Sequence, residues 1–216
     1  MSPRPYNAER RQVAAEETRQ RILDAACALL ASAEPPRSFS VEAIARQADV
    51  ARMTVYYQFG SKPGLLEALF DHLATRAEIG ARLRAAFSQP DPVASLHAVI
   101  AAFAHFWTLD RLIIRRLHAL AVLDPELEPR ERARNERRRT ALRRVLEQLR
   151  DGEHLEQQTD PDGILDTLQG LTSFETFDHL AGPDRTPEDV IPIVCRIADS
   201  LLGVGDAVRD SIVLPS

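Results

Sequence analysis

Apolar residues recur every three or four positions along most of the chain, and no run alternates as a β-strand would. The stripe from Ile22 to Leu30 is the first of these, and it predicts an amphipathic helix over about residues 17–32. Pro35-Pro36 would end this helix, because the residue before a proline is disfavoured in helical geometry. The pattern favours an all-α protein.

Two short helices follow in the pattern. Ser40 is placed to cap a helix that ends near Ala48, and a second helix spans about residues 51–58. Asp49 falls between them, where a tight turn needs a residue that tolerates left-handed backbone geometry. Ser61, followed by Lys62 and Pro63, marks the start of the next helix.

Longer helices fill the rest of the chain, which brings the total to about nine. They are expected over about residues 62–87, 92–109, 111–123, 125–151, 161–180 and 187–203. The predicted organisation is an N-terminal domain over residues 1–61, a larger helical domain over residues 62–205 and a tail over residues 206–216.

Composition narrows the class of protein. The 216 residues are 44% hydrophobic, which suffices for a globular core, and no apolar run approaches the length of a membrane span. Cys27 and Cys195 are far apart and match neither a metal site nor a disulfide framework. We expect a soluble cytoplasmic protein with no membrane partner, no bound metal and no cofactor.

The net charge of −5 disfavours an anionic partner for the chain as a whole, but the charge is unevenly distributed. Residues 151–216 carry fourteen acidic and three basic side chains, whereas residues 1–62 carry nine basic and seven acidic ones. Only the surface that faces phosphates has to be positive, so the composition permits a nucleic-acid partner at the N-terminus.

Two short helices joined by a three- to four-residue turn make a helix-turn-helix. In the second helix, Val55 and Phe59 lie four positions apart and are expected to point inward. The opposite face then displays apolar, aromatic and hydrogen-bonding side chains of the kind that read DNA grooves: Arg52, Met53, Thr54, Tyr56, Tyr57 and Gln58. Lys62, in the first turn of the next helix, is placed to bind a phosphate. The alternative is a three-helix core without a DNA role.

The segment "SFSVEAIARQADVARMTVYYQFGSKPGLLEALFDHL", residues 38–73, closely resembles the DNA-binding signature of the TetR family of transcriptional regulators. The preceding "TRQRILDAACALLAS" fits as well, and the similar run from Thr18 to Leu73 covers about a quarter of the chain. Asp49 departs from the pattern, since the family usually has glycine there.

The resemblance implies that the protein binds double-stranded operator DNA. The implied DNA-contacting residues are Ser40, Val41, Arg52, Met53, Thr54, Tyr56, Tyr57 and Lys62. Arg52 is the best candidate for a base-specific contact, because a guanidinium can bond bidentately to guanine. Upstream, Arg4, Arg10 and Arg11 either enter the minor groove or are solvated residues of an arm.

The C-terminal two-thirds holds no catalytic, phosphate-binding or metal-binding motif, so no enzyme activity is expected. The resemblance implies a homodimer that pairs its last two helices across a two-fold axis. The candidate interface residues are Ile164, Leu168, Leu171, Ile193, Ile197 and Leu201. Packing within the subunit is the alternative for each of them.

A cavity for a small-molecule effector is expected among the middle helices, lined by aromatic side chains with a few polar groups. The candidates are Phe103, Phe106, Trp107, His118, Phe174 and Phe177, and ordinary core packing is the alternative. The arginine-rich stretch over residues 130–144 is interleaved with Glu131 and Glu136, which favours a solvated helix face over a second nucleic-acid site.

The resemblance therefore implies a ligand-responsive regulator, most simply a repressor that binds a palindromic operator and that its effector releases from DNA. An activator or a ligand-independent regulator is the alternative. An enzyme with a DNA-binding appendage would need a catalytic constellation that the sequence lacks. A pure protein-interaction module would have no reason to keep Thr54, Tyr57 and Lys62.

Overall fold

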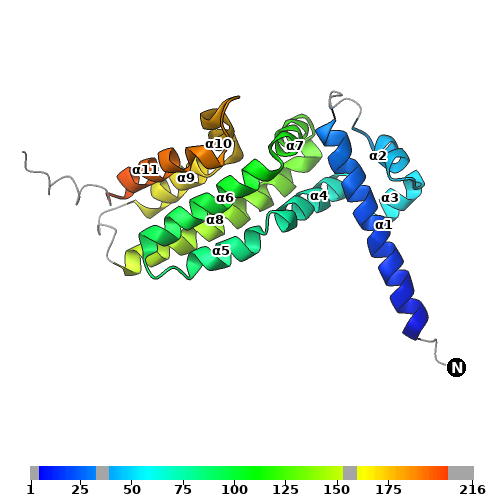
Figure 1. Cartoon of the computed structure of the whole chain (residues 1–216), viewed down its shortest axis with the longest axis horizontal. Coiled ribbons are helices and arrows are strands. Elements are labelled where there is room, and N and C mark those ends of the chain that lie inside the picture. The colour runs from blue at the N-terminus through cyan, green and yellow to red at the C-terminus, as the bar shows by residue number, and fades with distance from the viewer. Residues whose placement is uncertain (1–4, 33–38, 153–159, 204–216) are drawn as a thin grey trace, which may run out of the picture. The chain divides into compact units, whose positions relative to one another are not determined.

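The computed structural model describes residues 5–32, 39–152 and 160–203, and all regular structure in these ranges is helical (Figure 1). In chain order the elements are α1 (Pro5–Ala31), α2 (Val41–Gln47), α3 (Arg52–Phe59), α4 (Lys62–Arg76), α5 (Ile79–Phe87), α6 (Pro92–Leu109), α7 (Arg111–Leu123), η2 (Pro125–Leu127), α8 (Glu128–Asp151), α9 (Pro161–Leu171), α10 (Phe174–Ala181), η3 (Glu188–Val190) and α11 (Ile191–Leu202). The predicted all-α fold is confirmed. The arm residue Arg4, the break at Pro35-Pro36 and the tail over 206–216 lie outside the described residues.

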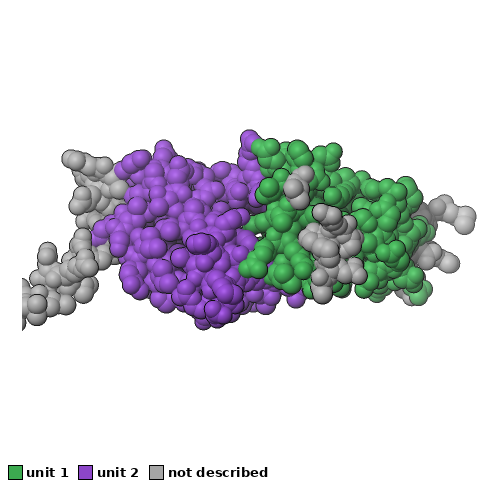
Figure 2. Space-filling model, turned by 90° about the horizontal axis from the view of Figure 1, so that it is seen from above, with its two compact units in different colours: residues 1–73, 112–130 green, residues 74–111, 131–216 purple. Residues whose placement is uncertain are grey.

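The chain forms two compact units, coloured green and purple in Figure 2. Unit 1 comprises residues 1–73 and 112–130, and unit 2 comprises residues 74–111 and 131–216. Unit 1 thus joins the helix-turn-helix segment to most of α4 and nearly all of α7. Helices α4, α7 and α8 each contribute residues to both units, so they connect the units covalently.

Unit 1 is built on apolar stripes with helical spacing. On α1, Ile22 and Ala26 are fully buried, and α2 packs against both α1 and α3. Leu65, Leu69 and Leu73 recur every fourth residue on α4 and are also fully buried. Burial of each such leucine stabilises the fold by about 1.5–3 kcal/mol, which two helices of seven and eight residues need in order to form at all.

Unit 2 has α6 at its centre, in contact with α5, α10 and α11 (Figure 1). Of the described helices, α6 alone is long and apolar enough to cross a membrane by length and composition. Its apolar residues are accounted for by packing, since Leu96, Val99 and Ile100 are fully buried. The Ser95 hydroxyl donates a 3.0 Å hydrogen bond to Gln148 on α8, so the buried serine is satisfied.

Two of the predicted long helices are each divided in the structure. The helix expected over 62–87 breaks between α4 and α5 at Glu78, whose φ of 52° is left-handed. The guanidinium of Arg82 donates to the carbonyl of Ala77, 3.2 Å away, which satisfies an acceptor at the end of α4. The helix expected over 161–180 breaks before α10, which Ser173 caps by accepting from the backbone N–H of Thr176 at 3.2 Å.

The first helix is longer than predicted, because it begins at Pro5 and not near residue 17. Its first part lacks a buried stripe, since the side chains from Arg10 to Glu17 are all exposed. Amphipathic periodicity could not reveal a helical segment that has no buried face. Arg10 and Arg11 therefore lie on a helix, and not in an extended arm.

Candidate nucleic-acid interface

The two short helices and their turn have the predicted local chemistry. The Ser40 hydroxyl accepts a 3.1 Å hydrogen bond from the backbone N–H of Ala43, which confirms Ser40 as the N-cap of α2. Asp49 has a φ of 51°, which confirms the left-handed position expected in the turn. At the other end of α3, Gly60 has a φ of 74° and its N–H bonds to the carbonyl of Tyr56.

Helix α3 has one buried face and one exposed face. Val55 is only 2% exposed, whereas Met53 is 72% and Tyr57 88% exposed. Met53 and Tyr57 lie four positions apart on one face of α3, and adjacent exposed apolar side chains of this kind are typical of interaction surfaces. Thr54 and Tyr56 are half-buried beside this face.

Contacts with α1 fix the C-terminal end of α3. The guanidinium of Arg19 lies 4.5 Å from the ring centroid of Phe59 and donates to the carbonyl of Gln58 at 3.3 Å. The Gln58 side chain donates in turn to the carbonyl of Ala15 at 3.2 Å. The sequence did not point to Arg19 or to this use of Gln58, since such contacts join positions about forty residues apart.

Arg52, the first residue of α3, is held by two neighbours. Its guanidinium lies 2.9 Å from the carboxylate of Glu42 on α2 and donates to the Tyr56 hydroxyl at 3.2 Å. The Tyr56 hydrogen bond and the negative charge of Glu42 raise the pKa of Arg52 above its ordinary value. The arginine is therefore a permanent cation whose direction is set by α2 and α3 together.

Lys62 is the first residue of α4 and follows the last residue of α3, Phe59, by three positions. Its ammonium lies 3.4 Å from the carboxylate of Asp124, and the lysine side chain is 39% exposed. Gly64, in the same first turn, allows α4 to approach α3 closely, because a Cβ on Gly64 would lie 2.1 Å from the carbonyl oxygen of Phe59. The Ser61 hydroxyl accepts from the N–H of Gly64 at 3.1 Å, which confirms the predicted helix start.

Of the remaining predicted DNA-contacting residues, Ser40 is half-buried and uses its hydroxyl as a cap. The Val41 side chain is buried, so only its backbone can meet DNA. The role of each predicted residue in DNA binding stays a prediction, but Arg52, Met53 and Tyr57 lie together on the exposed face of α3.

Five of the six predicted effector-binding residues lie in unit 2, where Phe103, Phe106, Trp107, Phe174 and Phe177 are all buried. The Trp107 indole donates to the carbonyl of Thr172 at 3.1 Å. Its ring lies 4.6 Å from Phe106 and 5.7 Å from Phe174, centroid to centroid. His118 is not among them, since it belongs to unit 1 and stacks on Phe70.

The predicted interface residues fall into two groups. Ile164 and Leu168 on α9 are buried within the chain. A second group keeps apolar surface exposed: Leu171, Ile193, Ile197 and Leu201. The last three recur every fourth residue along α11, and Ile197 is 42% exposed. An outward apolar stripe is what a helix pairing with a second subunit presents.

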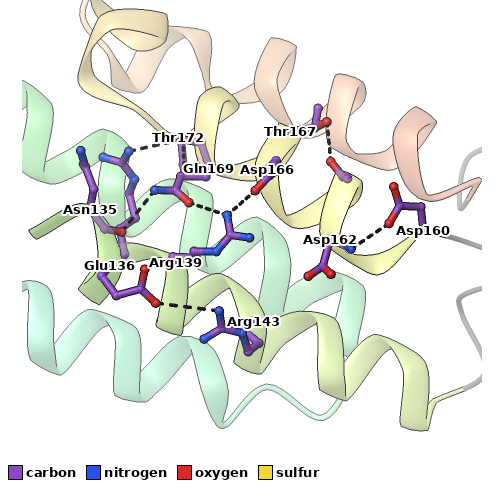
Figure 3. A network of polar contacts seen from close by, with 12 residues as sticks. Asn135, Glu136, Arg139, Arg143, Asp160, Asp162, Asp166, Thr167, Gln169 and Thr172 are labelled. Atoms are coloured by element: carbon purple, nitrogen blue, oxygen red, sulfur yellow. Dashed lines mark hydrogen bonds and ion pairs between the residues drawn. The ribbon is translucent and has the colours of Figure 1, made fainter. Parts of the chain in front are cut away.

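The arginine-rich stretch is not uniformly solvated (Figure 3). Arg139 bonds to the carboxylate of Asp166 and to the side chain of Gln169 on α9. Arg138 donates to the Gln169 carbonyl at 3.4 Å, and burial lowers its pKa. The expectation of a solvated face was thus wrong for these two residues, because α9 covers them. Arg137, Arg143 and Arg144 are exposed, and the predicted apolar stripe of α8 from Leu142 to Leu149 is buried.

Nothing in the described ranges resembles a metal centre, since no group of three or more His, Cys, Asp or Glu side chains could hold an ion. The described feature best suited to binding a macromolecule is the exposed face of α3, which carries Arg52, Met53 and Tyr57.

Comparisons with known proteins agree with this geometry. Residues 22–69 match the family model of bacterial regulatory proteins, tetR family. Comparison of the sequence with curated proteins gives no match.

Solved structures share the fold over most of the chain. The fatty acid degradation regulator FadR from Bacillus halodurans has a TM-score of 0.69 at 19% identity, over 86% of this chain and 95% of that chain. The TetR-family regulator PfmR from Thermus thermophilus has a TM-score of 0.60 at 20% identity, over 84% of this chain and 97% of that chain. A TetR-like regulator from Rhodococcus sp. RHA1 has a TM-score of 0.55 at 22% identity, over 88% of this chain and 96% of that chain. The helix-turn-helix segment thus matches the family model of bacterial regulatory proteins, tetR family, and the chain shares its fold with these solved regulators.

Proposed function

We propose that this protein is a transcriptional repressor of the TetR family that binds an inverted-repeat operator as a homodimer and is released by a small molecule. The observation that carries the proposal is the exposed face of α3, which presents Met53, Tyr57 and the cation of Arg52, the last paired with Glu42. The first residues of a recognition helix approach base edges in the major groove, which is where Arg52 and Met53 lie.

The homodimer follows from the size of this surface. A single eight-residue helix offers too few contacts for tight specific binding, and two copies on half-sites one helical turn apart, or a multiple of it, supply the rest. The outward stripe Ile193, Ile197 and Leu201 on α11 is the surface we assign to subunit pairing.

The effector site is assigned to unit 2, around Trp107 and its aromatic neighbours. Since α4, α7 and α8 have residues in both units, a ligand that shifts these helices would act on the DNA-binding unit through the chain itself. By linkage, an effector that weakens DNA binding must itself bind the DNA complex more weakly by the same factor, typically about 5–150-fold. The protein would act in the cytoplasm, where its DNA is.

Selection from a library of DNA duplexes with a long random central segment tests the proposal. The full-length protein should enrich an inverted repeat whose half-sites lie about one helical turn, or a multiple of it, apart. Enrichment of no sequence, or of a single asymmetric site, would contradict it.

A further inference from the structure

Glu42 stands at the proposed DNA-binding surface although its charge is unfavourable there. It lies in the first turn of α2, and its side chain is 55% exposed, close to the 58% of its partner Arg52. A carboxylate near DNA phosphates weakens binding by repulsion. The ion pair that Glu42 forms with Arg52 at 2.9 Å offers a function that offsets this repulsion.

The contacts with Glu42 and Tyr56 restrain the Arg52 side chain and still leave N–H donors of its guanidinium available to a base. A guanidinium has five N–H groups; one on Nη2 of Arg52 donates to the Tyr56 hydroxyl, and Nη1 forms an ion pair with the Glu42 carboxylate at 2.9 Å. The other hydrogens on Nη1 and Nη2 and the one on Nε remain for DNA, and two suffice for the O6 and N7 acceptors of a guanine. Arg52 can therefore contact a base while Glu42 and Tyr56 still hold it.

Restraint before binding has an energetic consequence. A free arginine side chain loses most of its rotamer freedom when it docks on a base edge. An Arg52 already aligned by Glu42 and by Tyr56, whose ring centroid lies 5.4 Å from its Cζ atom, loses less. The pair also strengthens when DNA excludes water from it, because the local dielectric constant falls.

We propose that Glu42 is a positioning residue that directs Arg52 toward one base pair per half-site, and so contributes to sequence preference and not to general affinity. This inference rests on the proposed function, in which Arg52 reads a base. It assigns to Glu42 a role in specificity that its charge alone would argue against.

The test repeats the random-duplex selection with full-length Glu42→Gln, Arg52→Ala and the double variant. Glu16→Gln, which neutralises an exposed carboxylate on α1, is the matched control for charge. Circular dichroism and the thermal unfolding midpoint check that each variant is folded. The readout is the base preference at each position, measured as relative enrichment.

We expect Arg52→Ala to abolish preference at one base pair per half-site. Glu42→Gln should reduce preference at that same base pair by about two- to fivefold, the range of exposed ion pairs, and leave other positions unchanged. The double variant should match Arg52→Ala, and Glu16→Gln should match the wild type.

Unchanged or sharpened preference at that base pair in Glu42→Gln would overturn the inference, because Glu42 would then not direct Arg52. Loss of preference spread over many positions would also overturn it. If the wild type enriches no sequence, the proposed function fails first and this inference with it, so the two failures are distinguishable.

Discussion

The ammonium of Lys62 lies 3.4 Å from the carboxylate of Asp124, so the lysine assigned to a DNA phosphate already has a partner within unit 1. Asp124 also caps η2, since its carboxylate accepts from the N–H of Glu126 at 3.2 Å. DNA therefore competes with Asp124 for this cation.

Lys62→Ala should weaken binding to all duplexes alike and lower the slope of log affinity against log salt by about one, because one phosphate contact is lost. Asp124→Asn should have the opposite effect, with binding to all duplexes strengthened by up to about fivefold, since asparagine can still cap η2 but no longer attracts the lysine. Fluorescence anisotropy titrations at several salt concentrations measure both. A change of base preference in Lys62→Ala would show that our division into phosphate and base contacts is wrong.

Gly64→Ala tests how closely α4 must approach α3. The added Cβ would lie 2.1 Å from the Phe59 carbonyl oxygen, which is backbone and cannot swing away. We expect the free energy of unfolding to fall by about 1–3 kcal/mol, the usual effect of overpacking, and DNA affinity to fall with it.

Gly80→Ala in α5 is the matched control. Its Cβ would meet only the flexible tip of Arg84 at 3.5 Å, so the better helix propensity of alanine should stabilise by up to about 1 kcal/mol. Urea denaturation measures both variants. Equal effects of the two substitutions would contradict the steric account of Gly64.

Local signals explain why much of this fold is predictable from the sequence. Ser40, Ser61 and Asp160 each accept a hydrogen bond from a backbone N–H within the next three residues, so their capping depends only on neighbouring residues. The turn at Asp49 and the buried stripe of α4 follow equally from short-range pattern and chemistry.

The features that the sequence did not reveal depend on distant residues or on weak local preferences. Glu78 adopts left-handed geometry without the glycine or asparagine that usually marks it. Arg139 binds Asp166 from 27 positions away, and Glu42 meets Arg52 only because the turn folds α2 beside α3. A single sequence gives no signal of such pairs.

Ile197→Glu tests the proposed subunit interface. The wild type should sediment at twice the 24.1 kDa chain mass, and a charge in the α11 stripe should shift it toward the monomer because an ionised carboxylate is costly to bury. Val122→Glu places the same charge on α7, at a side chain 82% exposed and outside the proposed interface, and should leave the dimer intact. A wild-type monomer at micromolar concentration, or an intact Ile197→Glu dimer, would contradict this assignment.

The most direct test of α3 as the DNA-reading helix is the affinity of wild type and Arg52→Ala for an enriched duplex and for its single-base-pair variants. For the wild type, changing the base pair read by Arg52 should cost about 1–3 kcal/mol per half-site. Arg52→Ala should be indifferent to that base pair and still discriminate at the others. Unchanged preferences of Arg52→Ala at every position would show that Arg52 reads no base, and would contradict the central claim.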